Sequence, residues 1–187
     1  MNAVLDIWDE VEAPPAPQLR PVSIDPKTSA LLVLDLQNNN CNLERRPRCV
    51  DSLRGIQELI GKARYENMPV VYSLTSKATA DDIRQEVLPL PGEPIVKSSV
   101  DKFFGTKLAE ILQETGVETV ILVGTAAEGA ILNTATGAAL RGYKVVVPVD
   151  GFSSSNIYAE QYTAWHLANS PGTKKKTILT RMNTISF

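Results

Sequence analysis

Short apolar runs alternate with amphipathic segments along most of this chain, and this alternation constrains its fold more than any other feature. Residues 29–37 (SALLVLDLQ) form a continuous apolar run, which is typical of a strand buried on both faces. Further strands are predicted at 69–74, 118–124, 143–150 and 176–180. Apolar residues spaced three and four apart predict intervening helices at 50–68, 105–117, 128–142 and 158–170. The pattern predicts a three-layer α/β/α sandwich, Rossmann-like, around a mainly parallel sheet.

The chain of 187 residues is long enough for one domain with a sizeable core. We predict an extended N-terminal arm over residues 1–27 and a single domain over residues 28–187. Five prolines between Pro14 and Pro26 exclude a helix or a central strand from the arm. The arm could wrap its own domain or a neighbouring subunit, or it could be an ordered tail without a partner.

Composition excludes several classes of function. The net charge of −2 gives no global basic field, so we expect no nucleic-acid partner and no membrane partner. The N-terminal segment lacks the pattern of a secretory signal, so we expect a cytoplasmic protein. Cys41 and Cys49 are too few for a disulfide framework, and we expect Cys41 to be an ordinary buried cysteine. The only histidine, His166, excludes a histidine-rich zinc site, and we expect neither a metal nor a cofactor.

In α/β folds of this kind, ligands bind beyond the carboxyl ends of the strands. Asp35 stands at the end of the first predicted strand, where partial burial would raise its pKa and suit it to proton transfer. It could equally cap the following loop. Lys97 follows the short apolar run PIV. It could point toward Asp35 at the carboxyl ends of the strands, or it could be an exposed lysine at a strand end. Lys102 and Lys107 lie nearby, so composition alone does not choose among the three lysines.

The segment VGTAAEGA, residues 123–130, joins the third strand to a helix. Its small residues let the backbone approach a ligand, and the free N–H groups at the start of the helix favour an anion or an oxyanion. Close packing of helix on strand also favours small residues. Glu128 could act as a base or orient water near Asp35, but acidic residues are also common at the positive end of a helix.

Three blocks of the sequence resemble the isochorismatase-like superfamily, which includes cysteine amidases related to nicotinamidase. The blocks are ALLVLDLQN (30–38), GEPIVKSSVDKFFGTKLAEIL (92–112) and VETVILVGTAAEGAILNTATGAALRGYKVVVPVDG (117–151). The resemblance implies a hydrolase whose triad positions fall on Asp35, Lys97 and Ala130, where the amidases have their nucleophilic cysteine. It implies an oxyanion hole formed by the backbone N–H groups of Ala126 and Ala130, with a cis peptide bond near Thr125–Ala126. The implied substrate-binding residues are Gln37, Phe103, Thr125 and Glu128.

Alanine cannot attack a carbonyl carbon, so the residue at position 130 leaves three explanations open. In the first, the hydrolase needs no nucleophile. True isochorismatases resemble this case, since they have glycine there and hydrolyse a vinyl ether, with the aspartate protonating the alkene carbon. In the second, the chain is a cysteine-dependent amidase inactivated at Ala130, naturally or by engineering. In the third, it is a non-catalytic relative that binds a small ligand or serves as a scaffold.

The resemblance also bears on substrate and assembly. The loop after the second strand lacks the histidines of the nicotinamidase metal site and the Trp-Gly segment that isochorismate enzymes use. Lys77 and Arg84 in this loop could meet an acidic small substrate. We expect a small-molecule substrate and, because relatives assemble, a homodimer or homotetramer.

Overall fold

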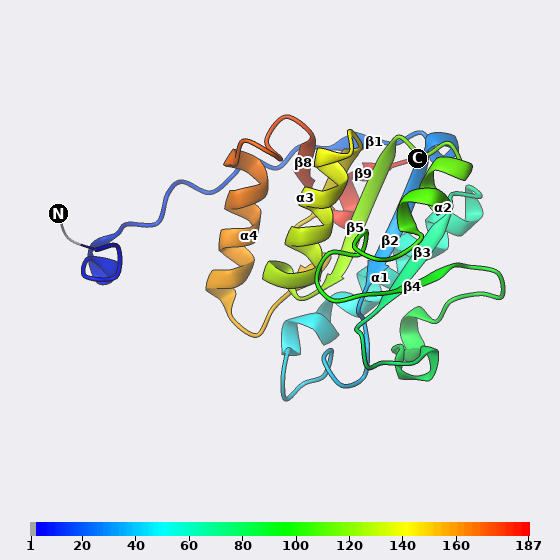
Figure 1. Ribbon diagram of the computed structural model, residues 1–187, viewed down its shortest axis with the longest axis horizontal. Coiled ribbons are helices and arrows are strands. Elements are labelled where there is room, and N and C mark those ends of the chain that lie inside the picture. The colour runs from blue at the N-terminus through cyan, green and yellow to red at the C-terminus, as the bar shows by residue number, and fades with distance from the viewer. Residues whose placement is uncertain (1–2) are drawn as a thin grey trace.

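The computed structural model describes residues 3–187 and is built around a parallel β-sheet (Figure 1). Six strands run side by side in the order β4-β3-β2-β5-β6-β8, and β7 pairs in parallel with the end of β5. The strands of this sheet are β2 (Ser29–Leu34), β3 (Val70–Leu74), β4 (Ile95–Lys97), β5 (Thr119–Thr125), β6 (Lys144–Pro148), β7 (Phe152–Ser153) and β8 (Thr177–Thr180). The expected fold class, a mainly parallel sheet between helical layers, is confirmed.

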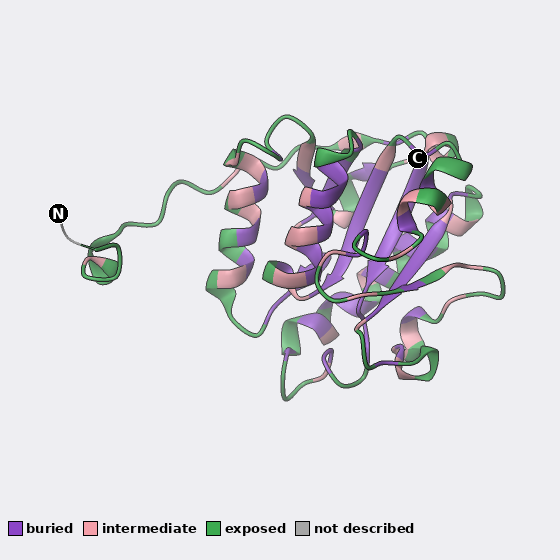
Figure 2. Ribbon diagram, in the orientation of Figure 1, coloured by how far each residue is buried: buried purple, intermediate pink, exposed green. Residues whose placement is uncertain are grey.

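The order of the strands reverses between β2 and β5. After β2 the chain builds β3 and β4 on one side, and it then crosses over to build β5, β6 and β8 on the other. Both central strands are buried along their length, as the purple arrows in Figure 2 show. The crevice beyond the carboxyl ends of such a pair is where α/β folds bind ligands, so Asp35 and Thr125 lie at the expected place.

Helices cover both faces of the sheet. Helix α1 (Pro47–Tyr65) packs on one face, and α2 (Leu108–Glu114), α3 (Leu132–Leu140) and α4 (Ile157–Asn169) pack on the other (Figure 1). Side chains of β2 alternate between the two cores, because successive residues of a strand point to opposite faces. Leu31 and Val33 join the core under α1, whereas Leu32 and Leu34 join the core under the other three helices. This explains why the strand is a continuous apolar run rather than an alternating one.

Among the element boundaries that differ from the sequence prediction, two bear on the site. The first strand ends at Leu34 rather than at residue 37, because Asp35 has a φ of 52° and turns the chain out of the sheet. Helix α1 begins at Pro47 rather than at residue 50, with proline at a position where its missing N–H costs nothing. The loop from residue 35 to residue 46 therefore leaves β2 abruptly and enters α1 early.

The helix predicted over 128–142 begins with a single π-helical turn, Ala127–Ile131, before it continues as α3. Short 3₁₀ helices punctuate the connecting segments, at Trp8–Glu10, Pro26–Thr28, Ala80–Asp82, Gln85–Val87 and Met182–Thr184. The two ends of the domain meet in a small parallel pairing of β1 (Val22–Ser23) with β9 (Ile185–Ser186). The end of the predicted arm thus joins the body of the protein.

The N-terminal arm extends along α4 and away from the sheet (Figure 1). A groove of about 980 Å³ lies between the arm and α4, lined by apolar and aromatic side chains that include Trp8, Tyr158, Tyr162 and Trp165. The rings of Trp8 and Tyr158 are 6.0 Å apart, in an edge-to-face arrangement. Among residues 3–187, no helix combines the length and the apolar character needed to cross a membrane.

Candidate functional site

Asp35 lies at the carboxyl end of β2 with only 4% of its surface exposed. Its positive φ is uncommon for a residue with a side chain, and residues held in this way often mark functional sites. Ser73 lies in the neighbouring strand β3, in register with Leu34, and donates its hydroxyl to Asp35 Oδ1 at 2.7 Å. The Asp35 N–H is also shared between the carbonyl and the hydroxyl of Ser73. These contacts hold the carboxyl group at the mouth of the crevice.

The cation beside Asp35 is Lys102, not Lys97 as the sequence prediction had it. Lys102 Nζ lies 2.8 Å from Asp35 Oδ2, and the Lys102 side chain is completely buried. Lys97 is exposed at the end of β4, the outermost strand, where it pairs in register with Leu74. The expected pairing of Asp35 with Lys97 is therefore wrong.

The loop after β4 explains this difference. Residues 98–106 fold back onto α3, where the Lys102 N–H donates to Thr134 Oγ1 at 3.2 Å and the Thr134 hydroxyl donates to the Val100 carbonyl at 3.3 Å. Lys102 Nζ also donates to the carbonyl oxygen of Ser98 at 3.1 Å. The fold-back carries a lysine five positions further along the chain to the carboxyl group, which spacing from a motif cannot show.

Two opposing effects act on the pKa of Asp35. Burial raises it above its ordinary value, since the charged form loses its hydration. The Lys102 ammonium, its hydrogen bond and the Ser73 hydroxyl act in the opposite direction, and burial is the larger effect. A carboxyl group with a raised pKa stays protonated over a wider pH range and is suited to donating a proton.

The turn after β5 lies next to Asp35, because Leu34 and Gly124 are in register in neighbouring strands. Gly124 has a φ of 133°, and a Cβ atom there would collide with the backbone of Leu34. The peptide bond between Thr125 and Ala126 is cis, where the family resemblance led us to expect one. Ala130 is buried in the following turn, and the Ala126 carbonyl accepts hydrogen bonds from the N–H groups of Gly129 and Ile131.

The other predicted site residues divide into two groups. Gln37 is fully buried near Asp35, where its Oε1 accepts a hydrogen bond from the Thr75 hydroxyl and its Nε2 has no partner within residues 3–187. Thr125 is fully buried and donates its hydroxyl to the Ser153 carbonyl at 3.0 Å. Glu128 is exposed on the turn. These three stay predicted binding residues, although the Thr125 hydroxyl already has an acceptor.

Phe103 is a buried core residue, and its expected role in substrate binding stays a prediction. Its ring stacks on Tyr143 at a centroid separation of 6.1 Å, and the Arg141 guanidinium lies over it at 4.5 Å. It also packs against Gly137, two turns along the helix from Ala130. The same fold-back that buries Lys102 points the next side chain the opposite way.

The two cations that were predicted to contact an acidic substrate, Lys77 and Arg84, form no ion pair or hydrogen bond with Asp35 within residues 3–187. Arg84 forms an ion pair with Glu86, with a nitrogen–oxygen distance of 2.6 Å, and Lys77 is exposed. A third cation, which sequence reasoning missed, is buried instead: Arg46, at the start of α1, is 8% exposed. Its position after a polar loop and before a proline gave no signal of burial.

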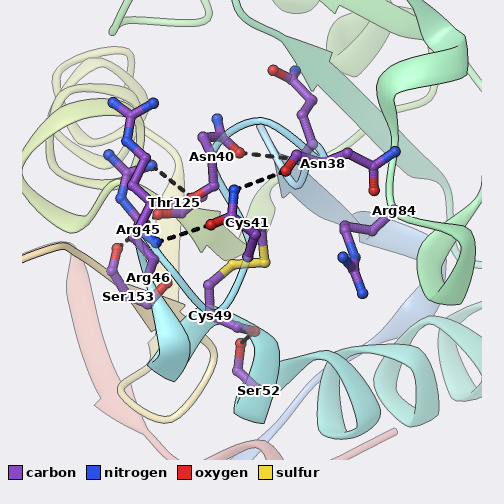
Figure 3. The surroundings of a disulfide bond; sticks show 12 residues. Asn38, Asn40, Cys41, Arg45, Arg46, Cys49, Ser52, Arg84, Thr125 and Ser153 are labelled. Atoms are coloured by element: carbon purple, nitrogen blue, oxygen red, sulfur yellow. Dashed lines mark hydrogen bonds between the residues drawn. A yellow bond between two sulfur atoms is a disulfide. The ribbon is translucent and has the colours of Figure 1, made fainter.

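Cys41 and Cys49 form a disulfide bond, so the expectation of an ordinary buried cysteine is wrong (Figure 3). The bond ties the loop after Asp35 to the first turn of α1, with the two Cα atoms 5.4 Å apart. The early start of α1 creates this proximity by turning the loop back on itself. Within residues 3–187, no group of three or more histidine, cysteine or acidic side chains is placed to hold a metal ion.

Comparisons with known proteins agree with this fold. The Secreted isochorismatase effector Isc1 of Verticillium dahliae is 28% identical over 149 residues, covering 73% of this chain and 78% of that protein. The Streptothricin hydrolase of Streptomyces noursei is 30% identical over 158 residues, covering 79% of this chain but only 60% of the relative. The crystal structure of an isochorismatase family protein from Desulfovibrio vulgaris has the same fold. Its TM-score is 0.75 at 20% identity, with 84% of this chain and 95% of that chain covered.

A family model, the isochorismatase domain, matches residues 29–176. The match begins with β2, which Asp35 directly follows, and extends past the turn that holds Ala130 and past α4. It thus includes every strand of the main sheet except the last. This chain belongs to the isochorismatase domain family.

Proposed function

We propose that this protein is a hydrolase of a small organic molecule in which Asp35 donates and accepts protons and no cysteine nucleophile takes part. The observation that carries the proposal is the buried ion pair of Asp35 with Lys102 beside the turn that holds Ala130. A buried carboxyl group with a raised pKa is suited to protonating a substrate. Lys102 takes the role that the sequence prediction gave to Lys97.

The reaction that fits this set of groups is the hydrolysis of a vinyl ether. The Asp35 carboxyl would transfer its proton to the alkene carbon, and water would add to the oxocarbenium carbon formed there. The water proton would return to the Asp35 carboxylate, and collapse of the hemiketal would release a carbonyl compound and an alcohol. The Lys102 ammonium, fixed at 2.8 Å, would stabilise the carboxylate between the two transfers.

The turn at 126–130 would stabilise charge without forming a covalent bond. Ala130 offers only a methyl group, so a covalent acyl intermediate has no side-chain attachment point at this position. The backbone N–H groups of Ala126 and Ala130 are the proposed donors to a developing negative charge. Gln37 would contribute through its Nε2, a buried donor without a partner in the described part of the chain.

Three forms of the protein test this proposal: the chain as it stands, Asp35→Asn and Ala130→Cys. Each is assayed against a panel of small vinyl ethers, by release of the carbonyl product, and against small amides, by release of ammonia. We expect the unmodified chain to hydrolyse a vinyl ether, and Asp35→Asn to lower kcat/KM by about 10²- to 10⁴-fold. Lys97→Gln is the matched control, because its exposed ammonium lies at the edge strand, and it should keep full activity.

Two outcomes would contradict the proposal. Ammonia release by Ala130→Cys alone would identify an amidase that has lost its nucleophile. Binding of panel compounds without turnover by any form would identify a ligand-binding or scaffold relative. Folding of each variant is checked by circular dichroism, so that loss of activity is not loss of structure.

We also propose that the protein self-associates as a homodimer or homotetramer. The support is the apolar surface that the arm and α4 leave exposed, which includes Val4, Leu5, Trp8 and Tyr158. The cytoplasmic location stays a prediction from the sequence, and the Cys41–Cys49 disulfide argues against it, because such bonds persist in oxidising compartments. The Verticillium relative is named as a secreted protein, which also favours a location outside the reducing cytoplasm.

A further inference from the structure

Arg46 is a buried cation without an ion-pair partner among residues 3–187. It is 8% exposed, and the carboxylates that form ion pairs elsewhere have other partners: Asp35 is held by Lys102, and Glu160 by Arg48. A buried charge is costly unless an opposite charge or several hydrogen bonds compensate for it. The position of Arg46 therefore favours the binding of an anion that the described residues do not supply.

The hydrogen bonds of Arg46 leave much of its guanidinium free. Nε donates to Ser155 Oγ at 3.3 Å and one terminal nitrogen donates to the Asn40 carbonyl at 3.3 Å, the two side-chain contacts it makes within the described residues. A guanidinium carries five N–H donors in a rigid fork. Both contacts are long and neutral, so they orient the fork without neutralising its charge.

The surroundings of Arg46 place it at the carboxyl end of β5. Ser153 pairs in register with Thr125, the last residue of that strand, and Ser155 follows two residues later (Figure 3). Ser155 accepts a hydrogen bond from Arg46 Nε, so Ser153 lies two residues along the chain from a direct contact of Arg46. The Ser153 hydroxyl is fully buried and has no hydrogen-bond partner in residues 3–187. A buried hydroxyl without a partner thus lies two residues from a group that Arg46 contacts.

Charges around Arg46 connect it to the proposed reaction site. Burial lowers the pKa of Arg46 below its ordinary value, and the neighbouring Arg45 acts in the same direction. Glu128 and Asp35 act in the opposite direction, which puts Arg46 within electrostatic reach of both. Neither carboxyl group forms an ion pair with Arg46, so the guanidinium lies near the reaction site without a direct anionic partner among the described residues.

We propose that Arg46 and the Ser153 hydroxyl bind a carboxylate group of the substrate beside Asp35. A guanidinium fork matches the two oxygens of a carboxylate. One guanidinium neutralises one negative charge, and the Glu128 carboxylate would repel a second one. A monoanion therefore fits better than a phosphate dianion. The inference rests on the proposed function for the position of the reacting group, and it names the substrate class: a small organic acid.

Binding measurements test this inference without any turnover. Isothermal titration calorimetry is run with acetate, pyruvate and benzoate, with benzamide as the neutral counterpart of benzoate and with inorganic phosphate. We expect at least one carboxylate to bind the unmodified chain. Arg46→Gln should weaken that binding by about 10-fold or more, and Ser153→Ala by a smaller factor. Arg45→Gln is the matched control, because the neighbouring arginine is exposed, and it should bind as the unmodified chain does.

Ser153→Ala keeps the test decisive if Arg46→Gln does not fold, because it removes one hydroxyl and no charge. Equal carboxylate binding by the unmodified chain and both variants would overturn the inference, as would the absence of binding by any carboxylate. Tighter binding of phosphate than of every carboxylate would overturn the choice of ligand. Carboxylate binding without vinyl-ether hydrolysis would defeat the proposed function alone, whereas hydrolysis unaffected by Arg46→Gln would defeat this inference alone.

Discussion

Lys102 Nζ and Asp35 Oδ2 lie 2.8 Å apart, with both side chains at least 95% removed from solvent. A pair buried to this extent is costly to break, because the remaining charge has no water to replace its partner. The pair joins two segments far apart in the sequence, the end of β2 and the loop after β4. It therefore bears on stability and on the proposed chemistry, and each can be measured separately.

Lys102→Met should lower the free energy of unfolding by about 3 kcal/mol at pH 7, because it leaves the Asp35 carboxylate buried without its cation. The loss should shrink as the pH falls, since Asp35 can then take up a proton and become neutral. Urea denaturation at several pH values measures both effects. Lys97→Met, at the exposed end of β4, should change stability by no more than about 0.5 kcal/mol. Equal effects of the two substitutions would refute the buried pair.

The raised pKa of Asp35 predicts a pH dependence of known sign. Between the unfolded value of 3.8 and the folded value, the folded state binds more protons than the unfolded state, so this group's contribution to stability falls as the pH rises. The difference in unfolding free energy between Asp35→Asn and the unmodified chain should therefore move in favour of asparagine over this interval. Denaturation curves from pH 4 to pH 8 give that difference, and the opposite slope would show a lowered pKa.

The same shift predicts the pH profile of the proposed reaction. If Asp35 donates the proton, kcat/KM for the vinyl ether should fall as the pH rises through the folded pKa of Asp35. A rate that instead rises over this interval would indicate a general base. Measuring the profile with Lys97→Gln as well separates the effect of the pair from that of an exposed lysine.

The disulfide between Cys41 and Cys49 should stabilise the loop that carries Asn40 and Arg46. The double substitution of both cysteines by serine should cost about 2.5 kcal/mol, as expected for closing a loop across a sequence separation of 8. Thermal unfolding with and without a thiol reductant gives the same comparison on the unmodified chain. Mass spectrometry after alkylation of protein from its natural source would show whether the bond forms there. Two free thiols in that material would support the cytoplasmic location.

Gly124 in β5 lies close against the backbone of Leu34 in β2. Gly124→Ala should abolish soluble expression or unfold the protein, because a Cβ would collide with the Leu34 backbone at a residue whose φ is already positive. Gly142→Ala is the matched control: its φ of 96° is also positive, but nothing lies within 4 Å of the added carbon. We expect the control to cost about 1 kcal/mol and to remain folded. Similar losses in both variants would mean that backbone conformation, and not the close approach, decides the effect at Gly124.

Self-association should appear in solution as a mass that is a multiple of 20.4 kDa. Light scattering during size-exclusion chromatography measures it directly, and Trp8→Ala with Tyr158→Ala should shift the equilibrium towards the monomer by removing aromatic surface from the arm and α4. Tyr65→Ala is a suitable control, because Tyr65 is an exposed aromatic residue on the opposite face of the sheet. A monomeric mass at all concentrations would contradict the proposed self-association.

The sequence by itself determined the architecture and the place of the site. Continuous apolar runs and helical spacing are local properties, and they located β2, α1, β5 and α4 to within a few residues of their observed ends. The carboxyl end of β2 was recognisable because a carboxylate directly after a buried strand is unusual. The turn after β5 was recognisable because its small residues let the backbone approach a ligand or a packed helix closely.

Only the tertiary structure decided which side chains meet. Composition does not choose between Lys97 and Lys102 and the family resemblance favoured Lys97, but the loop after β4 folds onto Thr134 and brings Lys102 to Asp35. The burial of Arg46 and the bond between the two cysteines depend on a loop that turns back after Asp35. The physical reason is that ion pairs and disulfides join residues through space, whereas sequence patterns report only what neighbours along the chain require.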